Sequence, residues 1–168
     1  GRYNVAIGSG ALETDDVGDA SIAIGYQALS SQNSDSDNET TANIGIGYYA
    51  GWYNVTGQNN TWLGYSAGFG ATGQSNSNNT GIGYHALKSV TTGGQNVAIG
   101  SYAGDSITSG DNNTLIGRGS DGAAGVDDQI ALGYAAITSA ANAIAIGVSI
   151  TNSTTETLMW GASGKTVI

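Results

Sequence analysis

The sequence contains no cysteine and no proline, and it has only one phenylalanine and four basic residues. Without cysteine, no disulfide can stabilise the fold. The four basic residues are scattered, and 13 acidic residues bring the net charge to −9, so no basic patch is available for nucleic-acid phosphates. The sequence has no run of about 18 apolar residues that could cross a membrane as a helix. The composition therefore predicts no nucleic-acid partner and no membrane insertion.

Glycine is abundant instead, with 28 residues in a chain of 168. Large aliphatic residues are sparse, whereas alanine, serine, threonine and asparagine are frequent. A thick core of leucine and phenylalanine is therefore not expected. A thin, repetitive structure fits this composition better.

A five-residue motif that ends in glycine recurs along the whole chain. The motif "NVAIG" at Asn4–Gly8 returns unchanged at Asn96–Gly100. Successive copies are spaced by 17, 22, 17, 19, 17, 17, 16, 14 and 14. A second motif, "GYxAL" or "GYxAG", begins at Gly25, Gly47, Gly64 and Gly83, and related sequences begin at Gly100 and Gly133. Such self-similarity is typical of repeat proteins. The ten copies close at Gly8, Gly25, Gly47, Gly64, Gly83, Gly100, Gly117, Gly133, Gly147 and Gly161.

Residues within each copy alternate in size, which favours a strand over a helix. Val5 and Ile7 fall on one face of an extended chain, and Ala6 falls on the other. A strand this short cannot bury a face alone, so equivalent strands must stack. We expect an all-β protein, a parallel β-solenoid or β-roll of about ten short coils, with two short strands and two turns per coil.

The pattern predicts one repeat domain over residues 1–168. Longer coils occupy 1–128, shorter 14-residue coils occupy 129–161, and a degraded last copy at 157–168 caps the stack. Small residues alternate with the bulky ones, and we expect them to form an outer face that another copy of the chain can approach closely. These residues are Ala6, Ala23, Gly45, Gly81, Ala98, Ala131 and Ala145, and Trp62, Leu115 and Met159 interrupt the series.

The "NVAIG" motif with 14-residue spacing resembles the head repeats of trimeric autotransporter adhesins. The longer motif, "GYxAL" followed by "TGxNNxxIG", resembles repeat regions of bacteriophage tail fibres. The resemblance implies a left-handed parallel β-roll assembled as a homotrimeric rod, on a virion tail fibre or another extracellular surface. Its implied role is a structural and host-attachment segment that binds a bacterial surface glycan or protein receptor. The irregular spacing favours the fibre; an adhesin head and a polysaccharide-degrading tailspike are the alternatives.

Aromatic residues concentrate near the third and fourth repeat glycines. They are candidates for receptor or glycan contact, because an aromatic ring offers an apolar face on which a sugar can stack. Stacked aromatic residues in neighbouring coils are also ordinary solenoid structure. The candidates are Tyr48, Tyr49, Trp52, Tyr53, Tyr65 and Phe69.

Asparagine recurs at the start of the motif, where side chains stacked one above another can bond turn backbone groups. The predicted structural ladder comprises Asn4, Asn43, Asn60, Asn79, Asn96 and Asn113.

In the longest insertion, alternating acidic residues are arranged like a calcium loop but lack its glycine and distal glutamate. Solvated charge is the main interpretation of these residues, which are Asp35, Asp37 and Glu39.

Residues for catalysis are not apparent. The acidic residues fall in or beside predicted turns, and the lone histidine, His85, has no acidic residue close in sequence. We therefore expect a protein that is not an enzyme and that needs no cofactor.

Overall fold

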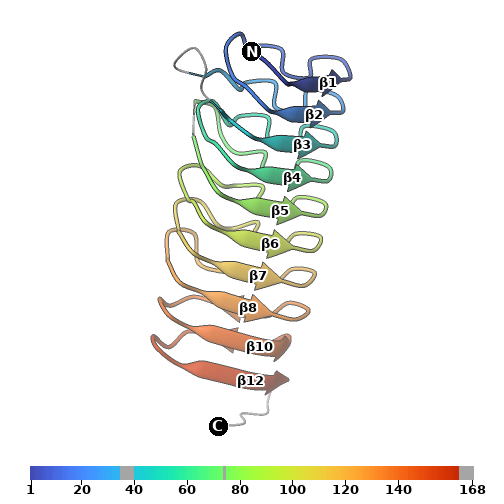
Figure 1. The fold of residues 1–168 in the computed structure, drawn as a ribbon. Coiled ribbons are helices and arrows are strands. Elements are labelled where there is room, and N and C mark those ends of the chain that lie inside the picture. Colours follow the sequence, from blue (N-terminus) through green and yellow to red (C-terminus); the bar gives the residue numbers. More distant parts are fainter. Residues whose placement is uncertain (35–39, 74, 163–168) are drawn as a thin grey trace.

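The computed structural model describes residues 1–34, 40–73 and 75–162, which form one stack of coils with β1 at one end and β12 at the other (Figure 1). Ten strands pair in a single sheet, and every neighbouring pair is parallel. The predicted all-β parallel solenoid is confirmed. The strands are β1 (Val5–Ile7), β2 (Ile22–Ile24), β3 (Ile44–Ile46), β4 (Thr61–Leu63), β5 (Thr80–Ile82), β6 (Val97–Ile99), β7 (Thr114–Ile116), β8 (Ile130–Leu132), β10 (Ile144–Val148) and β12 (Leu158–Ala162).

Strand pairing follows the register that the repeat predicts. Val5 pairs with Ile22, and Ile22 pairs with Ile44, so equivalent residues lie one above another. The two longest spacings between repeat glycines do not disturb this register, because β2, β3, β4 and β5 still pair through equivalent positions. Insertions are therefore accommodated outside the sheet.

The far side of the coils differs from the prediction of two strands per coil. Among the described residues, a second strand forms only in the last coils, where β9 (Ile137–Thr138) pairs in parallel with β11 (Thr151–Asn152). In the first six coils, the second and fourth residues after the repeat glycine have positive φ, as in Tyr49 (58°) and Gly51 (64°). A strand requires negative φ. Neighbouring coils still bond there, since Tyr49 N–H donates to the Tyr26 carbonyl (3.0 Å).

The fourth position after the repeat glycine explains why the second motif ends in either glycine or leucine. Gly51 adopts positive φ without a steric cost. Leu29 and Leu87 adopt φ of 49° at the same position, at a cost of about 1–2 kcal/mol for each residue. Both leucine side chains are fully buried, and burial of a leucine contributes about 1.5–3 kcal/mol. Core filling therefore offsets the backbone strain.

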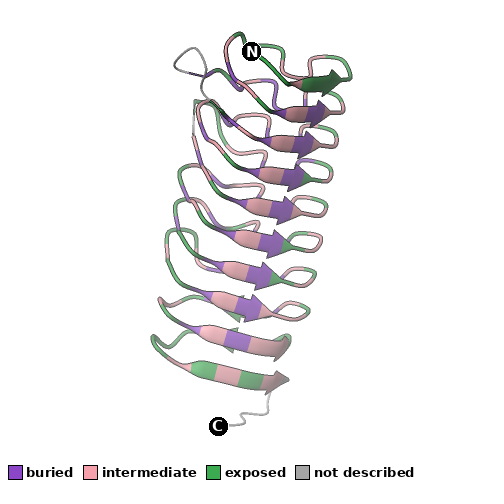
Figure 2. Ribbon diagram, in the orientation of Figure 1, coloured by how far each residue is buried: buried purple, intermediate pink, exposed green. Residues whose placement is uncertain are grey.

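The small residues of the strands face inward, so the predicted alanine outer face is wrong. Ala23, Ala98 and Ala131 are 0% exposed. Figure 2 shows a buried residue at the centre of β2 to β8 and within β10, whereas all of β1, at the end of the stack, is exposed. The coil is narrow, and its far wall lies close to the strand: a Cβ at Gly45 would lie 2.7 Å from Leu29 Cγ. Only small side chains fit most inner positions, and the branched residues turn outward.

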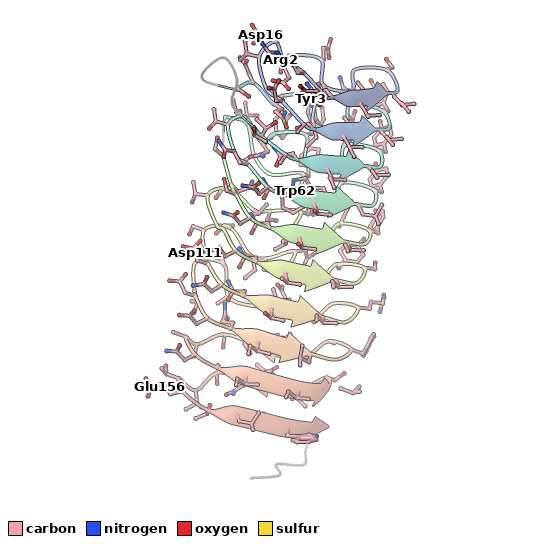
Figure 3. The ribbon with its side chains drawn as sticks, in the orientation of Figure 1. Arg2, Tyr3, Asp16, Trp62, Asp111 and Glu156 are labelled. Carbon is pink, nitrogen blue, oxygen red and sulfur yellow. The ribbon has the colours of Figure 1, made fainter. Side chains whose placement is uncertain are left out.

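Trp62 and Leu115 belong to the core instead of interrupting an outer face. Both are fully buried, and Met159 packs against the same core cluster. Trp62 lies inside the stack (Figure 3). Glycine on the surrounding coils makes room for it: a Cβ at Gly81 would lie 2.8 Å from Trp62 Cε3, and a Cβ at Gly51 would lie 2.5 Å from Cδ1. Large and small inner residues therefore compensate between coils.

The repeat glycines stack in a column along one edge of the sheet. Gly83 has a φ of 134°, and a Cβ there would lie 2.5 Å from the carbonyl oxygen of Gly100. Both the backbone conformation and the close approach of the next coil require glycine. The repeat glycine directly follows strands β1 to β8, lies within β10 and β12, and lets the coils stack closely.

Candidate functional site

The outward residues of the strands form one apolar surface along the stack, here called the outer sheet face. It consists of the first and third residues of each strand of the ten-stranded sheet, and most of them are isoleucine, valine, leucine or threonine. Several are exposed, from 37% at Ile99 to 60% at Trp160. Monomeric soluble proteins rarely expose apolar patches larger than a few hundred Å². The outer sheet face is therefore suited to being covered by another molecule.

Four tyrosines that directly follow repeat glycines stack in a column. The ring centroids of successive residues lie 5.0, 5.1 and 5.3 Å apart, with interplanar angles of 18°, 3° and 18°. All four are exposed, at 40–45%. The tyrosine column consists of Tyr26, Tyr48, Tyr65 and Tyr84.

The six aromatic residues predicted for receptor contact lie in one connected cluster. Tyr49 stacks on Trp52 with centroids 4.1 Å apart, and Trp52 stacks on Tyr53 at 4.8 Å. Phe69 meets these three rings edge-on. Tyr48 contacts Tyr49 at 4.1 Å and stacks on Tyr65, which joins the cluster to the tyrosine column.

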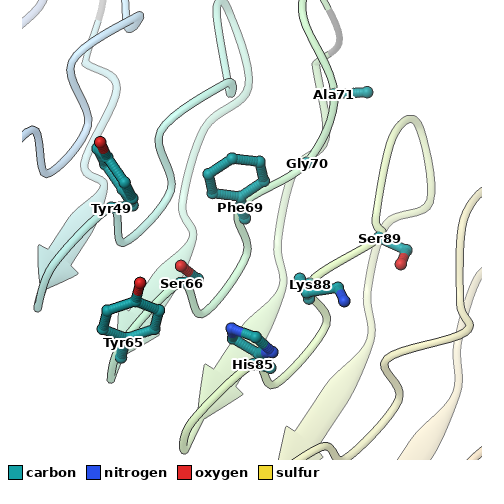
Figure 4. Close-up of a pocket in the computed structure, with 9 residues that line it drawn as sticks. All are labelled: Tyr49, Tyr65, Ser66, Phe69, Gly70, Ala71, His85, Lys88 and Ser89. Carbon is teal, nitrogen blue, oxygen red and sulfur yellow. The ribbon is translucent and has the colours of Figure 1, made fainter.

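A pocket of about 570 Å³ adjoins this cluster, and is here called the Phe69 pocket (Figure 4). Small-molecule sites have volumes of about 300–1,000 Å³. Three successive coils contribute its lining, which consists of Tyr49, Tyr65, Ser66, Phe69, Gly70, Ala71, His85, Lys88 and Ser89.

His85 and Lys88 were not among the predicted contact residues. His85 takes the same place after its repeat glycine as Tyr49 does, and Lys88 takes the same place as Trp52 and Phe69. Alignment of the repeats would therefore have placed both residues beside the aromatic cluster.

The pocket contains neutral polar groups and one cation. Burial, followed by the charge of Lys88, lowers the pKa of His85, and the carboxylate of Asp105 opposes this shift. Hydrogen bonding with the Tyr48 side chain, followed by burial, raises the pKa of Tyr49 to about 12. At neutral pH the imidazole and the phenol are therefore uncharged, and Lys88 supplies the positive charge.

The asparagine side chains form a hydrogen-bonded ladder through the stack. Asn60 N–H donates to Asn43 Oδ1, and Asn79 N–H donates to Asn60 Oδ1, both at 2.9 Å. The series continues through Asn96 and Asn113 with the same distances. Nδ2 of Asn96 also donates to the carbonyl of Gly110, in the turn of the next coil (2.9 Å). Asn4 bonds Ser21 N–H in the same way at the first coil (2.8 Å). The ladder ties turns to strands.

Replacing Asn79 with alanine is expected to lower the free energy of unfolding by at least about 2 kcal/mol. Asn79 is 1% exposed, and its side chain bonds Asn96 N–H and the Gly93 carbonyl (both 2.9 Å). The variant leaves both groups buried without these bonds. Urea unfolding followed by circular dichroism measures the loss. Asn4→Ala, at the half-buried end of the ladder, is the matched control, and equal losses in the two variants would contradict the prediction.

The described acidic residues lie outside the strands. Figure 3 shows Asp111 and Glu156 projecting from turns on the side of the stack where the strands begin, away from their arrowheads. Asp35, Asp37 and Glu39, the candidate calcium residues, lie outside the described residues. Within residues 1–34, 40–73 and 75–162, no cluster of three metal-binding side chains forms, and no helix is long and apolar enough to cross a membrane.

No protein-family model, curated protein or solved structure matches the chain.

Proposed function

We propose that the chain is a structural and host-attachment segment of a bacteriophage tail fibre. In this proposal three copies form a rod that carries the aromatic cluster to a glycan or protein receptor on a bacterial surface. The observation that carries the proposal is the outer sheet face, an apolar surface that continues over ten stacked strands. A chain working alone would leave this surface in water, at a cost of about 25 cal/mol for each Å² of apolar area.

Another copy of the same chain is the partner that best matches the outer sheet face. The face repeats at every coil, and a second copy offers the same apolar residues at the same spacing. Because all ten strands are parallel, the stack has a direction, and cyclic symmetry about a parallel axis places equivalent coils at the same height. Three copies, the number that the repeat resemblance implies, would enclose the three faces around one axis.

A rod of this kind suits attachment. Ten strands at about 4.8 Å per coil give a length of about 45 Å, held by backbone hydrogen bonds at every coil. None of the residues that line the Phe69 pocket is a strand residue of the outer sheet face. Assembly through that face therefore leaves the aromatic cluster available to a receptor.

The head of a bacterial adhesin is the second candidate. The spacing of the last coils favours it, since Gly133, Gly147 and Gly161 follow one another at equal intervals. The earlier coils are longer and less regular, as in fibre repeats, so we prefer the fibre.

Two measurements test the proposal. Light scattering of the native protein is expected to give three times the chain mass of 16.8 kDa. The fluorescently labelled protein is expected to bind a subset of bacterial strains, and purified surface polysaccharide or a protease treatment of the cells identifies the receptor class by removing the binding. The mass of a single chain would overturn the trimer, and absence of binding across a broad strain panel would overturn the attachment role.

A further inference from the structure

The walls of the Phe69 pocket are aromatic. Tyr49, Tyr65 and Phe69 come from two successive coils, and their rings border the opening (Figure 4). The apolar C–H face of a pyranose ring packs well on such rings, while phenol hydroxyls offer hydrogen bonds at the rim. The pocket walls are therefore complementary to a sugar ring.

Polar groups adjoin this aromatic surface. Ser66, on the same coil as Phe69, and Ser89, on the next coil, contribute hydroxyls. His85, also on the next coil, contributes an uncharged imidazole, whose Nδ1 is buried. Hydroxyl and imidazole groups both accept and donate hydrogen bonds to sugar hydroxyls. A ligand that carries several hydroxyls therefore finds partners on this side of the pocket.

Lys88 gives the pocket a charge opposite to that of the chain. The chain carries a net charge of −9 and has only four basic residues. Within the described part of the chain, Lys88 forms neither an ion pair nor a side-chain hydrogen bond, and its charge acts on His85 and Tyr84. Asp105 is the carboxylate that influences His85. An ammonium group without an ion-pair partner beside an aromatic wall is suited to bind an anion.

We propose that the Phe69 pocket binds one acidic sugar unit, a pyranose that carries a carboxylate, such as a uronic acid or a sialic acid. The ring packs on Phe69 and Tyr49, and the carboxylate accepts a hydrogen bond from the ammonium of Lys88. A neutral sugar would leave the ammonium unpaired. This inference rests on the proposed attachment function and names the class of glycan that it recognises.

Saturation-transfer NMR tests the inference with pairs of ligands that differ only in charge. The probes are the methyl glycosides of glucuronic acid, galacturonic acid and N-acetylneuraminic acid, each compared with its own methyl ester. At least one acid is expected to bind several-fold more tightly than its ester. Lys88→Gln is expected to weaken that acid about tenfold or more and to remove the preference over the ester, because it removes one charge-assisted hydrogen bond.

Arg118→Gln is the matched control, because it removes the same charge at a residue that does not line the pocket. Phe69→Ala separates stacking from charge, since it is expected to weaken the acid and the ester by the same factor. The inference is overturned if none of the three acids binds, if acid and ester bind equally, or if Lys88→Gln behaves like Arg118→Gln.

The two proposals fail separately. If the wild-type protein is trimeric and binds cells while no acid occupies the pocket, the acidic-sugar inference is wrong and attachment stands. If the native mass is that of a single chain and no strain is bound, the proposed function is wrong, whatever the result of the sugar titrations.

Discussion

Replacing Trp62 with alanine is expected to lower the free energy of unfolding by about 3–5 kcal/mol. Trp62 is fully buried and is the largest of the fully buried side chains. Its Nε1 has no hydrogen-bond partner among the described residues, so the ring stabilises the fold by packing. Gly51 and Gly81, on the neighbouring coils, lie against the indole ring and have no side chain with which to refill the space that alanine would leave. Urea unfolding followed by circular dichroism measures the loss.

Gly81→Ala makes this prediction specific, because the sign of its effect depends on Trp62. In the wild-type chain, the added methyl group would lie 2.8 Å from Trp62 Cε3, so Gly81→Ala is expected to destabilise. In the Trp62→Ala background, the same methyl group fills the space that the indole ring has left. It also gives this coil an alanine at the position that Ala98 occupies in the next coil. Gly81→Ala is therefore expected to stabilise the fold in that background. Coupling between contacting residues is about 0.5–3 kcal/mol. Equal costs in both backgrounds would show that the two residues do not share one space.

Replacing Leu63 and Ile116 together with aspartate is expected to convert the proposed trimer into single chains of 16.8 kDa. Both residues are exposed on the outer sheet face, at 43% and 39%. In a cyclic trimer each substitution places three carboxylates at one height around the axis, where desolvation and like charge oppose assembly. Light scattering measures the mass. Because both side chains point outward, the circular dichroism spectrum of the coil is expected to persist.

Asn59→Asp together with Asn112→Asp is the matched control for this experiment. The two residues are exposed, lie in turns of the same two coils and have positive φ, which aspartate tolerates. The control adds the same number of charges away from the sheet and is expected to keep the mass of the wild-type protein. Retention of that mass by the Leu63 and Ile116 variant would show that the outer sheet face is not the assembly surface.

Strand positions and register were predictable from sequence because each repeat carries a glycine that no other residue can replace. The column that includes Gly83 and Gly100 fixes which residues stand opposite one another, so the alignment of the repeats is also the alignment of the sheet. Insertions such as the one between Gly25 and Gly47 leave this relation intact.

The inner and outer faces were not predictable from the alternation alone. A period of two separates Ala6 from Val5 and Ile7, but it does not say which set is buried. Apolar bulk usually marks the core, and here the narrow coil interior reverses that rule, with Ala23 inside and Ile99 outside. The width of the coil depends on how closely the far wall, which includes Leu29, approaches strand positions such as Gly45. The alternation of residues along one strand does not predict that distance.

The far wall itself was unpredictable for a different reason. Positive φ is expected of glycine, yet Tyr49, His85 and Tyr102 adopt it as ordinary L-residues. Their conformation is imposed by hydrogen bonds to neighbouring coils, such as that from His85 N–H to the Tyr65 carbonyl (2.9 Å). Tertiary context of this kind leaves no signal in a single repeat. The aromatic cluster was nonetheless foreseeable, because its members occupy aligned positions.

The uniform junction between coils has a consequence for how such a chain changes over generations. Each coil meets the next through the same glycine contact and, in most coils, the same asparagine hydrogen bond. If one complete repeat were duplicated or deleted in the gene, the coils on either side would therefore still meet through the same contacts. Recombination could change the length of the stack by whole coils without altering the interactions that hold neighbouring coils together.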